Sequence, residues 1–112
     1  MSILTVIVAA YNAEKYIDRC ITSVISQNDD TELIVINDAS TDGTGERVKS
    51  YGSRVRLINL RENCGCVSKT RNIGLSYASG SYITFLDADD WYEPGAVNKI
   101  IEYINIYKAD IL

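Results

Sequence analysis

The chain has 112 residues, a length that suits one small domain, and its 46% hydrophobic content is enough for a buried core. The formal net charge of −4 argues against a nucleic-acid-binding surface, which needs a basic stripe, and no apolar segment is long enough for a membrane span. The three cysteines, Cys20, Cys64 and Cys66, are an odd number, which favours reduced thiols in a cytosolic protein.

The first half of the chain holds two apolar runs, each followed by a helical pattern. Residues 3–10 read ILTVIVAA, a short β-branched run typical of a strand buried on both faces of a parallel sheet. Asn12 is a candidate cap for a helix that starts at residue 13. The expected buried stripe of that helix is Tyr16, Ile17, Cys20, Ile21, Val24 and Ile25. Residues 32–37 form a second buried-type strand, and Thr44 is a candidate cap for a short helix to about residue 51.

The second half repeats this alternation. A third strand is expected over 55–60, a helix over 67–78 with Gly80 as its C-terminal stop, and a fourth strand over 82–86. Pro94 is placed for the first turn of a last helix, and residues 110–112 resemble the start of another strand. The expected apolar positions of these two helices are Val67, Thr70, Ile73, Gly74, Tyr77 and Ala78, then Val97, Ile100, Ile101, Ile104 and Tyr107, widened by Tyr103 and Ile106. Alternating strands and helices predict an α/β fold with a mostly parallel sheet between two helical layers.

An acidic cluster follows the fourth expected strand. Asp87, Asp89 and Asp90 lie within four residues, where they would repel one another unless a divalent cation bound their oxygens. In an extended stretch Asp87 and Asp89 point to the same face, so one can bind a metal while the other holds a water or a ligand hydroxyl. The alternative is a solvated turn in which Asp90 caps the next helix.

Polar residues follow three of the four expected strands. Parallel α/β sheets bind ligands outside the carboxyl ends of their strands, so we expect Tyr11, Asp38 and the acidic cluster at one edge. Tyr11 could stack on a base, Asp38 could accept a base N–H, and the acidic cluster could hold a metal-bound diphosphate. Lys69 and Arg71 could offset phosphate charge. Taken singly, each of these residues also suits a turn or a solvated surface.

Four segments of the chain resemble motifs of the family 2 glycosyltransferases, which have a GT-A type nucleotide-sugar-binding fold. The third segment carries Thr70 where alanine is usual in the family. The four follow one another in order and at fitting separations, which makes the resemblance highly specific. They are VIVAAYNAE (6–14), ELIVINDASTDGT (32–44), NCGCVSKTRNIGL (63–75) and YITFLDADDWYEPGAV (82–97).

The resemblance implies metal-assisted, inverting transfer of a sugar from a nucleotide-diphosphate sugar, most often a UDP-sugar, to a hydroxyl of a saccharide or lipid-linked acceptor. It implies a cytoplasmic location, at the membrane face where the acceptor is lipid-linked. The implied nucleotide-binding residues are Ala10, Tyr11, Glu14, Asp38, Arg71, Asp87 and Ala88. The implied ligands of a Mn²⁺ or Mg²⁺ ion are Asp89 and Asp87, with Asp90 as the alternative to Asp89.

The resemblance also implies that residues 1–112 are a single donor-binding domain whose acceptor-binding half lies in a later segment. The family's general base comes from that segment, so we expect this chain to bind a nucleotide but transfer no sugar. A non-catalytic nucleotide-binding module and a nucleotidyltransferase with a related sheet remain open. A receiver domain and a haloacid-dehalogenase-type phosphatase fit less well, because their acidic residues follow other strands.

Overall fold

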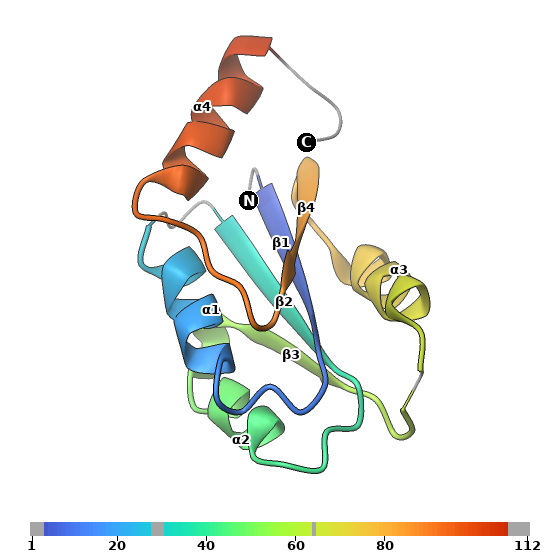
Figure 1. Cartoon of the computed structure of the whole chain (residues 1–112). Coiled ribbons are helices and arrows are strands. Elements are labelled where there is room, and N and C mark those ends of the chain that lie inside the picture. Colours follow the sequence, from blue (N-terminus) through green and yellow to red (C-terminus); the bar gives the residue numbers. More distant parts are fainter. Residues whose placement is uncertain (1–3, 28–30, 64, 108–112) are drawn as a thin grey trace.

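The computed structural model describes residues 4–27, 31–63 and 65–107. The strands β1, β2, β3 and β4 form one parallel sheet in the order β3-β2-β1-β4 (Figure 1). The α/β class predicted from the alternation of elements is therefore confirmed. The elements are β1 (Leu4–Ala10), α1 (Ile17–Ile25), β2 (Thr31–Asn37), α2 (Thr44–Lys49), the 3₁₀ helix η1 (Gly52–Arg54), β3 (Arg56–Asn59), α3 (Val67–Tyr77), β4 (Tyr82–Asp87) and α4 (Ala96–Tyr107).

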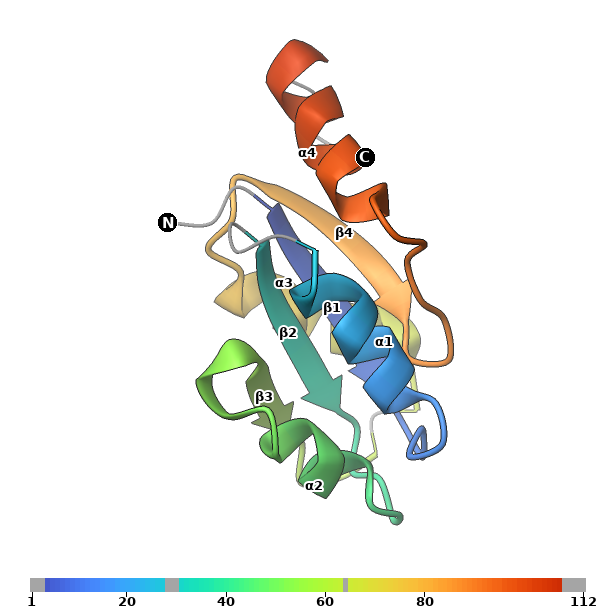
Figure 2. The same cartoon turned by 90° about the vertical axis from the view of Figure 1, so that its left-hand side faces the viewer.

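Helices cover both faces of the sheet, as Figures 1 and 2 show from two sides. Leu4, Val6 and Val8 of β1 face a core that they share with buried residues of α1, α2 and α4. Helix α3 packs on the opposite face, where Gly74 lies against Ile7. Because side chains alternate along a strand, β1 supplies the cores on both sides. The result is the expected three-layer α/β/α arrangement.

Helix α1 begins later than the sequence predicts. Its N-cap is Tyr16, and Asn12 instead has a left-handed backbone with φ 49°. The Asn12 side-chain oxygen accepts a hydrogen bond from the backbone N–H of Thr41 at 2.8 Å, so it connects two loops. Tyr16 was expected in the buried stripe, but it is 45% exposed because it precedes the helix.

Two other helix ends also differ from the predictions. Thr44 is the first residue of α2, whose N-cap is Gly43. The C-cap of α3 is Ala78, so Gly80 does not end that helix. A Cβ at Gly80 would lie 2.8 Å from the backbone nitrogen of Thr5, so Gly80 is required for a close approach to β1.

The last part of the chain is more exposed than its apolar pattern predicts. Among the described residues β4 lies at an edge of the sheet, and only Leu86 of this strand is buried. Tyr77, expected on the buried side of α3, is 42% exposed and carries the Arg56 guanidinium 4.9 Å from its ring centre. Helix α4 begins at Ala96, so Pro94 precedes its first turn.

Fewer of the apolar residues of α4 are buried than the sequence predicts. Val97 and Ile104 are buried, whereas Tyr103 and Ile106 are 48% and 62% exposed. In the described part of the chain no helix is both long and apolar enough to span a bilayer. Residue 3, Cys64, the strand expected at 110–112 and the side chains of Val67 and Tyr107 lie outside what the structure describes.

Candidate functional site

The carboxyl ends of β2, β1 and β4 lie side by side at one edge of the sheet. Ala9 of β1 is paired with Asp87 of β4. On the other side of β1, the backbone N–H of Asp38 donates to the carbonyl oxygen of Ala10 at 2.8 Å. Tyr11 continues the chain directly after β1, between these two acidic residues. Residues that are far apart in the sequence therefore meet at one edge, because all the strands run in the same direction.

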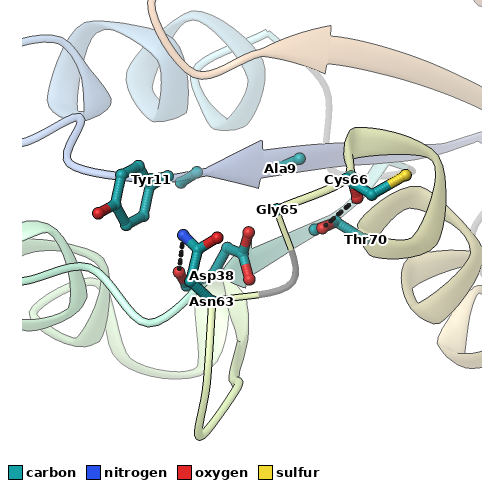
Figure 3. A pocket seen from close by; sticks show the side chains of 8 residues that line it. Ala9, Tyr11, Asp38, Asn63, Gly65, Cys66 and Thr70 are labelled. Carbon is teal, nitrogen blue, oxygen red and sulfur yellow. Dashed lines mark hydrogen bonds between the residues drawn. The ribbon is translucent and has the colours of Figure 1, made fainter.

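A pocket of about 310 Å³, here called the β1–α3 pocket, lies between the end of β1 and the start of α3 (Figure 3). Asp38 is only 8% exposed, and its backbone carbonyl accepts a hydrogen bond from the Asn63 side chain at 3.2 Å. Tyr11 is 51% exposed and lines the pocket with its ring. A buried carboxylate beside an aromatic ring can hold a flat heterocycle that carries N–H donors. The lining residues are Ala9, Ala10, Tyr11, Asp38, Asn63, Gly65, Cys66 and Thr70.

A second pocket of about 350 Å³, here called the β1–β4 pocket, lies beside the first. Ala9 and Tyr11 line both pockets, so the two are contiguous at the end of β1. The second pocket contains two of the acidic residues, Asp87 and Asp89. Its lining residues are Ala9, Tyr11, Asn12, Ala13, Tyr16, Asp87, Ala88 and Asp89.

The acidic cluster forms a turn instead of the extended stretch expected from the sequence. The backbone N–H of Asp90 donates to the carbonyl oxygen of Asp87 at 2.9 Å, which reverses the chain after β4. Asp87 and Asp89 nevertheless line the same pocket. The Asp90 carboxylate accepts a hydrogen bond from the backbone N–H of Trp91 at 2.9 Å and is not among the lining residues.

Two oxygen donors suit a hard divalent cation but do not complete its coordination. Within the described residues, no group of three or more His, Cys, Asp or Glu side chains comes together as a metal site. In the same part of the chain the Asp89 carboxylate makes no hydrogen bond or ion pair. A cation at Asp87 and Asp89 would therefore take further oxygens from water or from a ligand.

Arg71 lies beside Asp87 and lines neither pocket. Its Nη2 atom is 3.5 Å from Asp87 Oδ1, and its guanidinium carbon is 5.0 Å from the centre of the Phe85 ring. The Arg71 and Asp87 side chains are 40% and 68% exposed, so solvent screens this ion pair. Lys69, two residues earlier on α3, is exposed.

Glu14 lines neither pocket, although the family resemblance implies nucleotide contact. One carboxylate oxygen accepts a hydrogen bond from the backbone N–H of Gly43 at 3.0 Å, and the other lies 3.6 Å from Arg47 Nε. Asp42 acts in the same region. Several hydrogen bonds hold the pKa of Asp42 below its ordinary value, and the one from the Thr44 hydroxyl has the largest effect. Both carboxylates fasten the loop after β1 to the start of α2.

Two cysteines near the site differ in burial and in the pKa of the thiol. Burial, together with the negative charges of the acidic cluster, raises the pKa of the Cys20 thiol to about 12. Cys66 is exposed at the N-cap of α3, where the backbone N–H of Lys69 and then that of Ser68 hold its pKa below the ordinary value. Cys66 also lines the β1–α3 pocket. An exposed thiol with a lowered pKa is the one of the two expected to react.

Several residues that line the pockets were not predicted as site residues from the sequence. Asn63, Gly65, Cys66 and Thr70 come from the loop after β3 and the first turns of α3. This loop also leaves the carboxyl end of a parallel strand, so the rule applied to the other strands would have identified it. The prediction did not include this loop because β3 is short, lies at an edge of the sheet among the described residues, and has no acidic residue directly after its last residue.

The fold and the two pockets define a class: a parallel α/β domain with a composite ligand site at the carboxyl ends of its strands. The family model described as glycosyl transferase family 2 matches residues 5–112. The chain belongs to glycosyl transferase family 2.

Named relatives agree with this family. The chain is 43% identical over 110 residues to glycosyltransferase GlyA of Streptococcus pneumoniae, covering 96% of this chain and 16% of GlyA. The crystal structure of Staphylococcus aureus TarS 1-349 in complex with UDP-GlcNAc matches with a TM-score of 0.90 and 31% identity, over 98% of this chain and 33% of that one. The mannosyltransferase PcManGT of Pyrobaculum calidifontis, in complex with GDP-Man and Mn²⁺, matches with a TM-score of 0.81 and 25% identity, over 91% of this chain and 32% of that one. The chain thus has the GT-A, Rossmann-like fold and spans a third or less of these relatives.

Proposed function

We propose that this chain binds a nucleotide-diphosphate sugar, with UDP as the preferred nucleotide, and is the donor-binding part of a glycosyltransferase. The observation that carries the proposal is that two contiguous pockets meet at Tyr11, one with the buried Asp38 and the other with Asp87 and Asp89. Family membership supports it, as do the UDP-GlcNAc, UDP and GDP-Man complexes of the matching structures.

The base belongs in the β1–α3 pocket. Tyr11 offers an aromatic face for stacking, and Asp38, only 8% exposed, offers a carboxylate to a base N–H. A uracil ring presents one N–H between two carbonyl groups and so needs an acceptor of this kind. Asn63, which fastens the backbone of Asp38, keeps that acceptor in place.

The diphosphate belongs in the β1–β4 pocket. Two carboxylates there would repel a diphosphate, so a divalent cation must neutralise the contact. We assign direct binding of Mn²⁺ or Mg²⁺ to Asp89, with Asp87 beside it, because Asp90 already accepts a hydrogen bond from Trp91 N–H. When bound, the cation supplies Lewis-acid stabilisation of the departing diphosphate. Ala10 and Ala88 complete the walls of the two pockets without adding charge.

The proposed reaction transfers the sugar to an acceptor hydroxyl with inversion at the anomeric carbon. Direct displacement needs a general base for the acceptor proton, and we assign that role to none of the described carboxylates. Asp87 and Asp89 face the donor, Glu14 binds Gly43, and Asp38 is buried beside the base. The acceptor is a saccharide or a lipid-linked sugar. Its binding site and the general base belong to the remainder of a longer glycosyltransferase. That enzyme works at the cytoplasmic side, where nucleotide sugars are found.

Calorimetry with UDP and GDP, each with and without Mn²⁺, tests the proposal. We expect UDP to bind more tightly than GDP, and Mn²⁺ to strengthen binding. Asp89→Asn should remove the Mn²⁺-dependent part of the affinity. Asp90→Asn is the matched control, because it removes the same charge one residue away while its side-chain oxygen can still accept the Trp91 N–H. Equal losses in the two variants would refute the Asp89 assignment, and a wild-type chain that binds neither nucleotide would refute the function.

A further inference from the structure

One face of α1 contacts the acidic loop, defined as residues 87–95, at several points. Three of the contacting residues, Cys20, Ser23 and Gln27, follow one another at intervals of three and four positions, which places them along one side of the helix and its C-terminal end. The Cys20 thiol lies 3.7 Å from the carbonyl oxygen of Asp87. The Arg19 guanidinium stacks over the ring of Trp91, 3.7 Å from its centre.

Hydrogen bonds continue this contact beyond Trp91. The backbone N–H of Tyr92 donates to the Ser23 hydroxyl at 3.0 Å. Gln27, just after the helix, donates its side-chain N–H to the carbonyl oxygen of Glu93 at 3.1 Å. Its side-chain oxygen accepts from the backbone N–H of Val97 at 2.8 Å, at the start of α4. Gln27 therefore binds both the last part of the acidic loop and the first turn of α4.

Two of these contacts, at Tyr92 and Glu93, involve backbone groups that lie outside any helix or strand. Residues 90–93 are in neither a helix nor a strand, and buried or half-buried backbone groups need partners. The Ser23 hydroxyl donates to the carbonyl oxygen of Cys20 at 2.7 Å, which turns its lone pairs toward the Tyr92 N–H. Its orientation is thus set by α1 and not by the loop.

We propose that this face of α1 is a template for the acidic loop, and that Ser23 and Gln27 are positioning residues for Asp87 and Asp89. The proposal rests on the proposed function, in which these two carboxylates hold the cation and the diphosphate. Asp89 lies on the turn with an exposed side chain, and Asp87, the last residue of β4, has an exposed side chain whose one ion pair is with Arg71. The positions of both carboxylates therefore depend on the backbone that carries them. A loop that is already ordered loses less conformational entropy when it binds a ligand.

Ser23 and Ser26 offer a matched pair of substitutions. The Ser26 hydroxyl donates to the carbonyl oxygen of Thr22 within α1, whereas the Ser23 hydroxyl also accepts from the acidic loop. Ser23→Ala and Ser26→Ala therefore remove the same group from α1 and its C-cap, but only the first removes a hydrogen bond with the loop. Gln27→Met removes the hydrogen bonds to Glu93 and Val97, together with one to the carbonyl oxygen of Ser23, while keeping a side chain of similar length.

Trp91 provides a readout that needs no ligand, because it is the only tryptophan of the 112-residue chain. We expect acrylamide to quench its fluorescence more strongly in Ser23→Ala and Gln27→Met than in wild type or Ser26→Ala. In calorimetry, Ser23→Ala should weaken Mn²⁺-dependent UDP binding roughly three- to tenfold, the range expected for one lost hydrogen bond, and Gln27→Met at least as much. UDP binding without metal should not change, since the β1–α3 pocket does not contact this segment.

The two readouts separate this proposal from the proposed function. If acrylamide quenches Trp91 equally in Ser23→Ala and Ser26→Ala, and both variants bind UDP with Mn²⁺ equally well, α1 is not a template. If Ser23→Ala weakens metal-free and metal-dependent UDP binding equally, its role is general stability and the positioning role is wrong. If the wild-type chain binds no nucleotide, the proposed function fails and the positioning role falls with it. Trp91 quenching then still shows whether α1 orders the loop.

Discussion

The Arg71 guanidinium lies 3.5 Å from the Asp87 carboxylate. A proposed metal ligand is therefore already paired with a positively charged side chain. A positive charge there opposes a divalent ion. We predict that Arg71→Met strengthens Mn²⁺ binding in the absence of nucleotide by roughly two- to fivefold, the scale of a solvent-screened charge pair. Titration of Trp91 fluorescence with Mn²⁺ measures it, because Trp91 is two residues from Asp89.

Lys69→Met is the matched control for this prediction. Lys69 lies on the same helix and is exposed, so the substitution changes the net charge equally without touching Asp87. If both variants strengthen Mn²⁺ binding to the same extent, the effect comes from overall charge and not from the ion pair. Arg71→Met should also weaken UDP binding if Arg71 turns toward the phosphates when the donor is bound.

Cys66 should react with iodoacetamide at neutral pH, whereas Cys20 should react only after unfolding. The lowered pKa of Cys66 gives it more thiolate at a given pH, and the pKa of about 12 keeps Cys20 neutral as well as buried. Saturating UDP should slow modification of Cys66, which lines the proposed base pocket. Mass spectrometry of a Cys64→Ser background identifies the modified residue. If UDP did not slow the modification of Cys66, Cys66 would not lie in the base pocket. If Cys20 reacted faster than Cys66 in the folded protein, the predicted order of thiol reactivity would be wrong.

Glu32 should make the stability of the fold depend on acid pH. Burial alone raises the pKa of Glu32, but hydrogen bonds from Ser79 and Thr5, with the Arg56 charge, outweigh it and lower the pKa from its ordinary 4.5. A carboxyl with a lowered pKa stabilises the folded state above its unfolded-state pKa, and this contribution is lost as the pH falls through the folded-state value. Stability should therefore decline below about pH 4.5.

Glu32→Gln tests the source of this decline. The variant should be less stable than wild type at pH 7 by about 1 kcal/mol, because it loses charge-assisted hydrogen bonds. The difference should narrow as the pH falls, since wild type then protonates the same group. Urea denaturation at several pH values measures it, with Glu102→Gln on the exposed side of α4 as the control. If the difference in stability between the two proteins stayed the same at every pH, ionisation of Glu32 would not be the cause of the decline.

Gly80→Ala should destabilise the protein more than Gly74→Ala, although the nearest contact of either new Cβ is at 2.5 Å. At Gly80 the next contacts are backbone atoms of Thr5 and Leu4, which cannot move without disturbing β1. At Gly74 all close contacts are with the Ile7 side chain, and alanine is also the better helix former by about 1 kcal/mol. We expect Gly80→Ala to cost more than about 2 kcal/mol. Thermal and urea unfolding compare the two, and an equal or reversed order would contradict the explanation.

Some features followed from the sequence because they depend on local patterns. The apolar run at Leu4–Ala10 predicted a buried strand, and its parallel partners follow from the helices between the strands. Helix ends were predicted less well. Asn12 and Thr44 have the side chains of helix caps, but each makes tertiary hydrogen bonds between the loops after β1 and β2 instead. Such a competition is invisible in a single segment.

The sequence by itself determined the class of fold and the edge of the sheet where polar residues gather, because strand direction and side-chain alternation are local properties. Only the tertiary structure decided what each polar residue contacts. It placed Glu14 on Gly43, Arg71 on Asp87, and Ser23 and Gln27 on the acidic loop, across up to 70 positions of sequence. Those contacts depend on how helices pack against the sheet, and packing is set by the whole core at once.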